Sequence, residues 1–177
     1  MIRAKTGGIK MRLAFIVISF LATFFLVGCN RIPPEYRAFL ERSTVEQHEV
    51  MRKLPMDKQI DYYLAGMRYM EPPQMGLADD IAKEGKQALP FLVKRLRDEK
   101  DEKNQADLIF VFEIMHGRYY KLKDETGVLN LLQQTADNMK DTFQKGRGEE
   151  ALKYIRTDQL PEVEKTLGDL NKQPPNQ

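Results

Sequence analysis

The chain contains a single cysteine, Cys29, which stands at the end of the only long apolar run in the sequence. The run covers residues 13–27 and is interrupted only by Ser19 and Thr23. As a helix of 15 residues it reaches about 22 Å, which is short of the roughly 30 Å of a bilayer hydrocarbon core. Basic residues and no acidic ones precede it. This order is typical of a secretory signal and not of a permanent membrane span.

Residues Leu26, Val27, Gly28 and Cys29 resemble the lipobox of bacterial lipoproteins, in which an aliphatic residue, a small or aliphatic residue and Gly or Ala precede the cysteine. The resemblance implies cleavage between Gly28 and Cys29, diacylglycerol on the Cys29 sulfur, and a further acyl chain on the new amino group. Because one acyl chain binds a membrane only marginally, three chains imply permanent anchoring. The alternative interpretation is an uncleaved membrane anchor with a chance cysteine.

The lipobox also implies a location in the cell envelope. Asn30 follows the cysteine, where the inner-membrane retention signal of enteric bacteria has an aspartate. In a Gram-negative host the resemblance therefore implies the periplasmic face of the outer membrane. The membrane is thus the first expected partner, reached through the lipid on Cys29.

Removing the leader reverses the sign of the net charge. The whole chain has 28 Lys and Arg residues against 26 Asp and Glu residues, a formal net charge of +2. The leader holds four of the basic residues, namely Arg3, Lys5, Lys10 and Arg12, so acids outnumber bases by two in the remainder. Nucleic acid is therefore not an expected partner. Lipidation also consumes the only cysteine, so the exported domain must be stabilised by packing and not by disulfides.

Apolar residues recur at helical spacing over residues 35–170, and no segment shows sustained two-residue alternation or an Asn-Gly or Asp-Gly hairpin signal. We therefore predict an all-α fold of antiparallel helical hairpins joined by short turns. The predicted organisation is a signal peptide over 1–28, a lipidated cysteine and spacer over 29–34, one helical domain over 35–170, and a disordered tail over 171–177.

Several boundaries follow from local signals. Ser43-Thr44-Val45-Glu46 predicts a capping box. Asp57 is the predicted cap of the next helix, which Pro72-Pro73 ends, and Gly85 interrupts a later one. The sequence also predicts one helix from Val128 to Phe143 that stops at Gly146-Arg147-Gly148, then a shorter helix with Leu152 and Ile155, then a last turn or two within 161–170.

The apolar run at residues 108–112 has two interpretations. A buried strand explains five consecutive apolar residues as well as a helix does. We choose a helix, because the segment continues to Tyr119 with no turn signal before Gly117.

Residues 88–98 resemble the first helix of a HEAT repeat, with matching positions at Pro90, Leu92, Leu96 and Asp98. The second helix of the unit departs from the family, because Lys103 and Asn104 stand where the repeat usually has valine and arginine. It is nevertheless strongly apolar, as the inner helix of a repeat should be. Over residues 88–116 the resemblance implies stacked hairpins, since one such unit cannot bury its apolar face alone.

The sequence offers little for catalysis. The two histidines, His48 and His116, lack the spacing of a zinc-protease helix, and we interpret both as structural or exposed. No phosphate loop, nucleophile elbow or metal-ligand spacing is present, so no cofactor or metal is expected. An envelope hydrolase remains the enzymatic alternative, with two carboxylates brought together by folding as acid and base.

Tyrosines are the least ordinary feature of the predicted domain. We name Tyr62, Tyr69, Tyr119 and Tyr120 as candidate partner contacts, because tyrosine is enriched at interfaces, while core-edge tyrosines remain the plainer interpretation. The expected function is a non-enzymatic, membrane-anchored helical module that binds another envelope protein. An assembly accessory and an immunity or exclusion lipoprotein that neutralises a partner are equally compatible with the sequence.

Overall fold

The computed structural model describes residues 32–159. The predicted signal peptide, the cleavage site at Gly28 and Cys29, the turn predicted within 161–170 and the predicted tail lie outside these residues. Every regular element of the described part is helical, which confirms the predicted all-α fold. In chain order the elements are α2 (Pro34–Leu40), α3 (Thr44–Met51), α4 (Met56–Tyr69), α5 (Leu77–Ala82), the short 3₁₀ helix η1 (Gly85–Gln87), α6 (Leu89–Asp98), α7 (Glu102–Arg118), α8 (Thr126–Asn138) and α9 (Thr142–Thr157).

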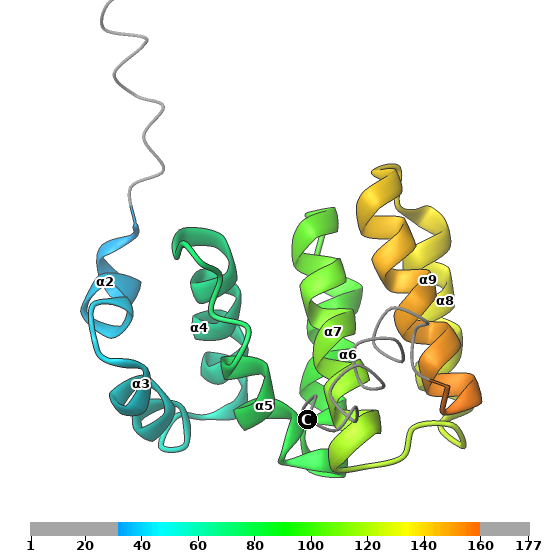
Figure 1. Cartoon of the computed structure of the whole chain (residues 1–177), viewed down its shortest axis with the longest axis horizontal. Coiled ribbons are helices and arrows are strands. Elements are labelled where there is room, and N and C mark those ends of the chain that lie inside the picture. Colours follow the sequence, from blue (N-terminus) through cyan, green and yellow to red (C-terminus); the bar gives the residue numbers. More distant parts are fainter. Residues whose placement is uncertain (1–31, 160–177) are drawn as a thin grey trace, which may run out of the picture. The chain divides into compact units, whose positions relative to one another are not determined.

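The helices are arranged as consecutive hairpins in two rows. Within the first row α2 packs on α4, α4 on α6 and α6 on α8, and within the second α3 packs on α5, α5 on α7 and α7 on α9. Each hairpin also packs its own two helices together (Figure 1). This pattern, in which each unit contacts mainly its neighbours, is that of a helical solenoid. The predicted stacking of hairpins is therefore present, and it extends beyond residues 88–116 to the whole described part.

Helix α7 is the centre of the core. It lies between α5 and α9 in its row and also contacts α4, α6 and α8. Most of its apolar side chains are therefore buried on several sides, and the least exposed are Leu108, Ile109, Val111, Phe112 and Met115. This burial explains the five-residue apolar run that the sequence left open between strand and helix. The helix is confirmed, and its contacts with neighbouring helices on several sides supply the reason for the continuous apolar character.

Helix starts and stops follow the sequence in most places. The capping box is confirmed: the Ser43 hydroxyl accepts the Glu46 N–H at 3.4 Å, and a Glu46 carboxylate oxygen accepts the Ser43 N–H at 3.0 Å. Helix α4 ends before Pro72-Pro73, as predicted. The prediction for Asp57 was wrong, because Pro55 occupies the N-cap without a side-chain hydrogen bond and Asp57 lies in the first turn. Proline suits a helix start because it has no N–H to satisfy and a helical φ.

The prediction for residues 128–157 was also wrong. Helix α8 ends at Asn138, and α9 runs without a break through Gly146-Arg147-Gly148. Gly148 is instead a point of close approach: a Cβ built there would lie 3.2 Å from the Ala136 Cβ and 3.4 Å from the Ile109 Cδ1. The glycine therefore serves packing of α9 against α8 and α7, and the start of α9 is marked by Asp141, which caps it.

Within residues 32–159, no helix has the length and apolar character that crossing a membrane requires.

Candidate functional site

An open groove of about 900 Å³ runs between α4 and α6. These neighbours in the first row pack less closely than α5 and α7 in the second row, which leaves space between them. The groove has one buried apolar residue in its wall, Ile60, and one half-exposed aromatic ring, Phe91, which is 45% exposed. The remaining lining residues are Asp57, Asp61, Pro90, Lys94, Arg95, Asp98 and Glu99.

Helical spacing explains why these residues share one surface. On α4 the lining residues stand three and four positions apart, and on α6 they recur at every turn. The apolar stripe of α6, made of Leu89, Leu92 and Leu96, is buried in the core on another side of the helix. Phe91 is thus an aromatic residue outside that stripe, on the side of α6 that also carries Lys94 and Arg95. This departure from the pattern is the sequence signal that could have revealed the groove.

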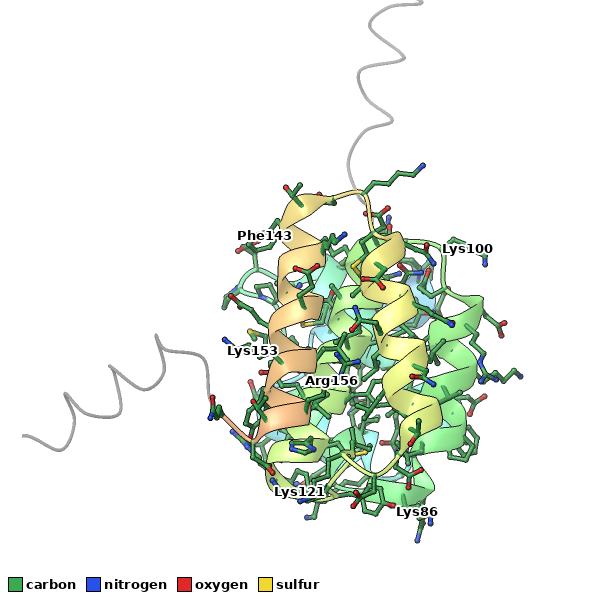
Figure 2. The ribbon with its side chains drawn as sticks, turned by 90° about the vertical axis from the view of Figure 1, so that its right-hand side faces the viewer. Lys86, Lys100, Lys121, Phe143, Lys153 and Arg156 are labelled. Carbon is green, nitrogen blue, oxygen red and sulfur yellow. The ribbon has the colours of Figure 1, made fainter. Side chains whose placement is uncertain are left out.

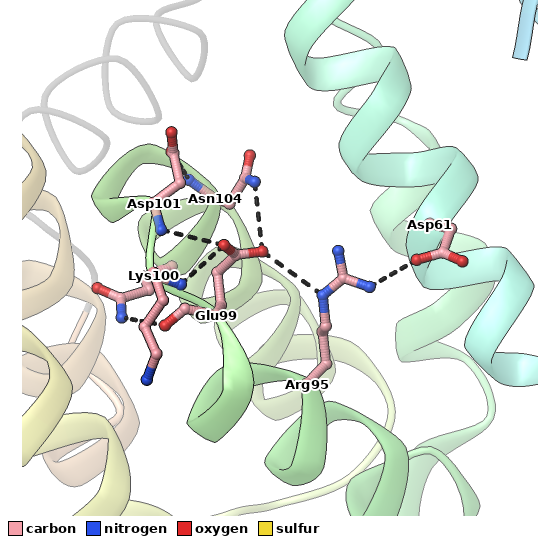
Figure 3. A network of polar contacts seen from close by, with 7 residues as sticks. Asp61, Arg95, Glu99, Lys100, Asp101 and Asn104 are labelled. Carbon is pink, nitrogen blue, oxygen red and sulfur yellow. Dashed lines mark hydrogen bonds and ion pairs between the residues drawn. The ribbon is translucent and has the colours of Figure 1, made fainter. Parts of the chain in front are cut away.

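Arg95 links the two walls of the groove. Its guanidinium donates to the Asp61 carboxylate of α4 at 2.5 Å, and its Nε lies 3.5 Å from the Glu99 carboxylate just after α6 (Figure 3). Glu99 also accepts the N–H groups of Lys100 at 2.8 Å and Asp101 at 3.0 Å. These contacts join α4, the end of α6 and the turn before α7 into one polar network.

The network decides the ionisation of Glu99. Partial burial by itself raises the pKa of the Glu99 carboxyl group, but the N–H groups of Asp101 and Lys100, the Asn104 amide and the Arg95 charge together lower it. Glu99 therefore stays ionised at neutral pH. Asp61 pairs with Arg95 and also with Lys58, at 3.4 Å. An acid–base pair needs one carboxyl group that holds its proton near the working pH. Glu99, whose pKa is lowered, does not meet this requirement, and the groove uses it and Asp61 as ion-pair partners of Arg95.

Each histidine is held by its own aspartate. His48 of α3 pairs through Nδ1 with Asp80 of α5, and Asp80 also lies 3.5 Å from the Arg52 guanidinium. The neighbouring acid of α5, Asp79, accepts hydrogen bonds from the other direction, from residues that follow or end α7. The consecutive aspartates of α5 therefore join α3 on one side to α7 on the other, which is a structural role.

His116 is buried and structural. Its Nδ1 accepts the Leu122 N–H at 3.1 Å, so the ring proton lies on Nε2, which donates to the Asp158 carboxylate at 2.9 Å. The Lys121 ammonium pairs with the same carboxylate. The ring therefore fastens the loop after α7 to the C-terminal end of α9. No third ligand accompanies either histidine: within residues 32–159 no group of three or more His, Cys, Asp or Glu side chains is placed to hold a metal ion.

The four candidate tyrosines do not form one surface. Tyr62 packs edge-on against Tyr36 and Phe39 of α2, with ring centroids 5.3 and 4.7 Å away. Tyr69 ends α4, and the Lys103 ammonium donates to the Met67 carbonyl oxygen, which places this end of α4 beside the start of α7.

Tyr119 and Tyr120 follow the other end of α7. Their hydroxyl groups donate to Asp79 at 2.7 Å and to Glu125 at 2.6 Å, respectively. These hydrogen bonds to carboxylates, together with partial burial, raise the pKa of both phenols. Tyr119 is 40% exposed, so a contact role remains a prediction for it, and the structure gives Tyr62 mainly a packing role.

No family model matches the chain, and no curated protein or solved structure matches it either.

Proposed function

We propose that this protein is a lipid-anchored, non-enzymatic helical module that binds another protein of the bacterial cell envelope through the groove between α4 and α6. The single observation that carries the binding role is Phe91, a ring 45% exposed in an open groove that also contains the buried Ile60. Aromatic side chains in such positions supply much of the energy of protein interfaces, because they bury a large area on binding.

The architecture supports the same role. Stacked hairpins present long surfaces built from successive helices, which is how solenoid proteins bind their partners. The polar network around Arg95 holds the two walls at a set distance, because it joins α4 to α6 by charged hydrogen bonds. A groove that is already shaped loses less conformational entropy on binding than a flexible one.

The anchor supports an envelope partner. In the proposal Cys29 carries the lipid, and α2 begins at Pro34, so only a short spacer separates the membrane attachment from the domain. Confinement at a membrane surface raises the effective concentration of the module toward other proteins of that surface. The proposed location is the periplasmic face of the outer membrane if the host is Gram-negative.

The partner is tested by crosslinking the full-length protein in its own envelope and identifying what co-purifies. The informative variant is Phe91→Glu, and the matched control is Phe143→Glu. Phe143 is 69% exposed, lies in the first turn of α9, where Figure 2 labels it, and is not one of the residues that line the groove. We expect one envelope protein to be captured by the wild type and the control and lost from Phe91→Glu. Equal capture by all three would refute a role for the groove.

The anchor is tested separately by metabolic labelling with a palmitate analogue and by the mass of the intact protein. We expect label on the wild type, removal of residues 1–28, and loss of the Cys29→Ser variant from the membrane fraction. An unlabelled wild type, or equal membrane retention of both proteins, would show that the chain is not a lipoprotein.

A further inference from the structure

We propose that the groove between α4 and α6 takes a basic amphipathic peptide segment of its partner: an aromatic or aliphatic side chain packs beside Phe91 and Ile60, and two Lys or Arg side chains pair with Asp57 and Asp98. The inference names the partner class for the same groove and therefore rests on the proposed function.

The charge of the groove is the first argument. Its lining contains four carboxylates, from Asp57, Asp61, Asp98 and Glu99, but only two cations, from Lys94 and Arg95. The Arg95 guanidinium is already shared between Asp61 and Glu99. Among the described residues, the carboxylates of Asp57 and Asp98 have no hydrogen-bond or ion-pair partner. These two carboxylates can therefore form ion pairs with a cationic partner.

The placement of these acids is the second argument. Asp57 lies in the first turn of α4, and Asp98 is the last residue of α6. Arg95 and Asp61 face each other between them, which sets α4 and α6 side by side along the groove. Phe91 lies one turn before Arg95, and Asp57 lies one turn before Asp61, so Phe91 and Asp57 lie toward the starts of α6 and α4, while Asp98 lies at the end of α6. A peptide with an apolar anchor, one basic residue beside it and another about two helical turns further along matches this order of groups.

The chemistry of the lining argues for a peptide over a small apolar ligand. Small-molecule sites are mostly apolar, enclose their ligand and carry a few placed polar groups. Here six of the nine lining residues are charged and the groove is open. A peptide segment in such a groove leaves its charged side chains partly in water, where opposite charges fix register and speed association.

The test uses synthetic peptides and the full-length lipidated protein in nanodiscs of zwitterionic phosphatidylcholine, with empty nanodiscs as the reference. The probe is an amphipathic peptide of leucine and lysine with one tryptophan. Two matched peptides keep its length: one replaces every lysine by glutamate, and one replaces every leucine and the tryptophan by serine. Binding is measured by surface plasmon resonance at low and at physiological ionic strength, because exposed ion pairs weaken as salt rises.

We expect the leucine–lysine peptide to bind, and both matched peptides to bind about tenfold more weakly or not at all. Asp57→Asn and Asp98→Asn should each weaken binding about two- to fivefold, as exposed ion pairs do. Lys94→Gln should strengthen it, because Lys94 repels a cationic partner. The controls are Glu150→Gln, an exposed acid of α9, and Phe143→Ala beside Phe91→Ala.

The inference is overturned if the glutamate peptide binds as well as the lysine peptide, if Asp57→Asn and Asp98→Asn leave binding unchanged, or if no peptide binds. In those cases a partner captured from the envelope in a Phe91-dependent manner would still support the proposed function. If instead the lysine peptide binds through Asp57 and Asp98 but no Phe91-dependent partner exists in the envelope, the proposed function fails while the chemistry of the groove holds.

Discussion

The Tyr63 hydroxyl of α4 donates a hydrogen bond of 2.9 Å to the main-chain carbonyl oxygen of Asp107 in α7. Both residues are fully buried, and the bond crosses between the two rows of helices. Because the phenol is buried and ionising it would break this hydrogen bond, the ionisation of Tyr63 is coupled to folding.

Because of Tyr63, we expect the free energy of unfolding to depend on pH in the alkaline range. Burial, and then the Asp107 charge, raise the pKa of the phenol well above its ordinary value of 10.0, although the Arg147 charge lowers it somewhat. The folded protein therefore keeps a proton that the unfolded chain loses above about pH 10, and the free energy of unfolding falls as pH rises beyond that point. We expect Tyr63→Phe to reduce this fall, as measured by urea unfolding between about pH 8 and pH 11.

The free energy of unfolding near pH 8 is the control for the same variant, because the phenol is then protonated in both the folded and the unfolded protein. There Tyr63→Phe should cost about 1 kcal/mol for the lost hydrogen bond. An equally steep alkaline fall in wild type and variant would contradict the coupling.

Substitution of Asp107 should destabilise the protein more than substitution of an exposed polar residue. Its carboxylate has no exposed surface, lies 3.1 Å from the Arg147 guanidinium of α9 and lies 3.7 Å from the Lys103 ammonium of its own helix. The Arg147 and Lys103 side chains are 28% and 47% exposed and can be hydrated when their partner is removed, so we expect Asp107→Ala to lower the free energy of unfolding by about 2 kcal/mol, mainly through the lost charged contact. Asp137→Ala, at an exposed position of α8, should change it by less than about 0.5 kcal/mol. Similar losses at both positions in chemical denaturation would contradict the burial argument.

Two glycines of α9 should respond to alanine with opposite signs. A Cβ at Gly146 meets nothing within 4 Å, so Gly146→Ala should stabilise the protein by about 1 kcal/mol through helix propensity. A Cβ at Gly148 would lie 3.2 Å from the Ala136 Cβ, which the backbone of α8 holds in place. We expect Gly148→Ala to destabilise, since crowding in a packed core costs about 1–3 kcal/mol. Thermal unfolding of the two variants distinguishes them, and stabilisation by both would mean that α8 and α9 separate easily.

The capping box should contribute measurably to the stability of α3 in the first hairpin. Ser43→Ala removes the acceptor of the Glu46 N–H and should cost about 1 kcal/mol. Thr44→Ala is the matched control, because within residues 32–159 the Thr44 hydroxyl has no hydrogen-bond partner. Native-state hydrogen exchange of α3 measures the difference locally, and equal effects of the two changes would show that the cap adds nothing.

Local signals predicted most helices because they act over a few neighbouring residues. Ser43 and Glu46 determine where α3 starts, and Pro72-Pro73 determines where α4 can no longer continue. The same reasoning failed at Gly146-Arg147-Gly148, because glycine has two meanings. Glycine can end a helix, because its backbone adopts conformations that other residues rarely adopt. It can also let two helices pack closely, because it has no side chain. Only the positions of Ile109 and Ala136 show that Gly148 serves close packing.

The candidate site was less accessible to sequence reasoning. The tyrosines stood out by composition, yet folding separates them, with Tyr62 against α2 and Tyr119 beside α5. The groove depends on residues more than thirty positions apart, such as Asp61 and Arg95, whose meeting is a matter of how α4 and α6 pack. The sequence pattern of one helix does not indicate which residues of another helix it will contact.

By itself the sequence determined the helical class and the order of most hairpins, because apolar spacing and turn residues act within one or two helical turns. The lipid anchor at Cys29 also stands on sequence alone, as a prediction. Only the tertiary structure decided that Phe91 and the two open acids share a groove and that Asp107 is buried among charges. Such contacts join segments that are distant in the chain. Their free energy depends on packing and on the exclusion of water, and both arise only when several helices come together.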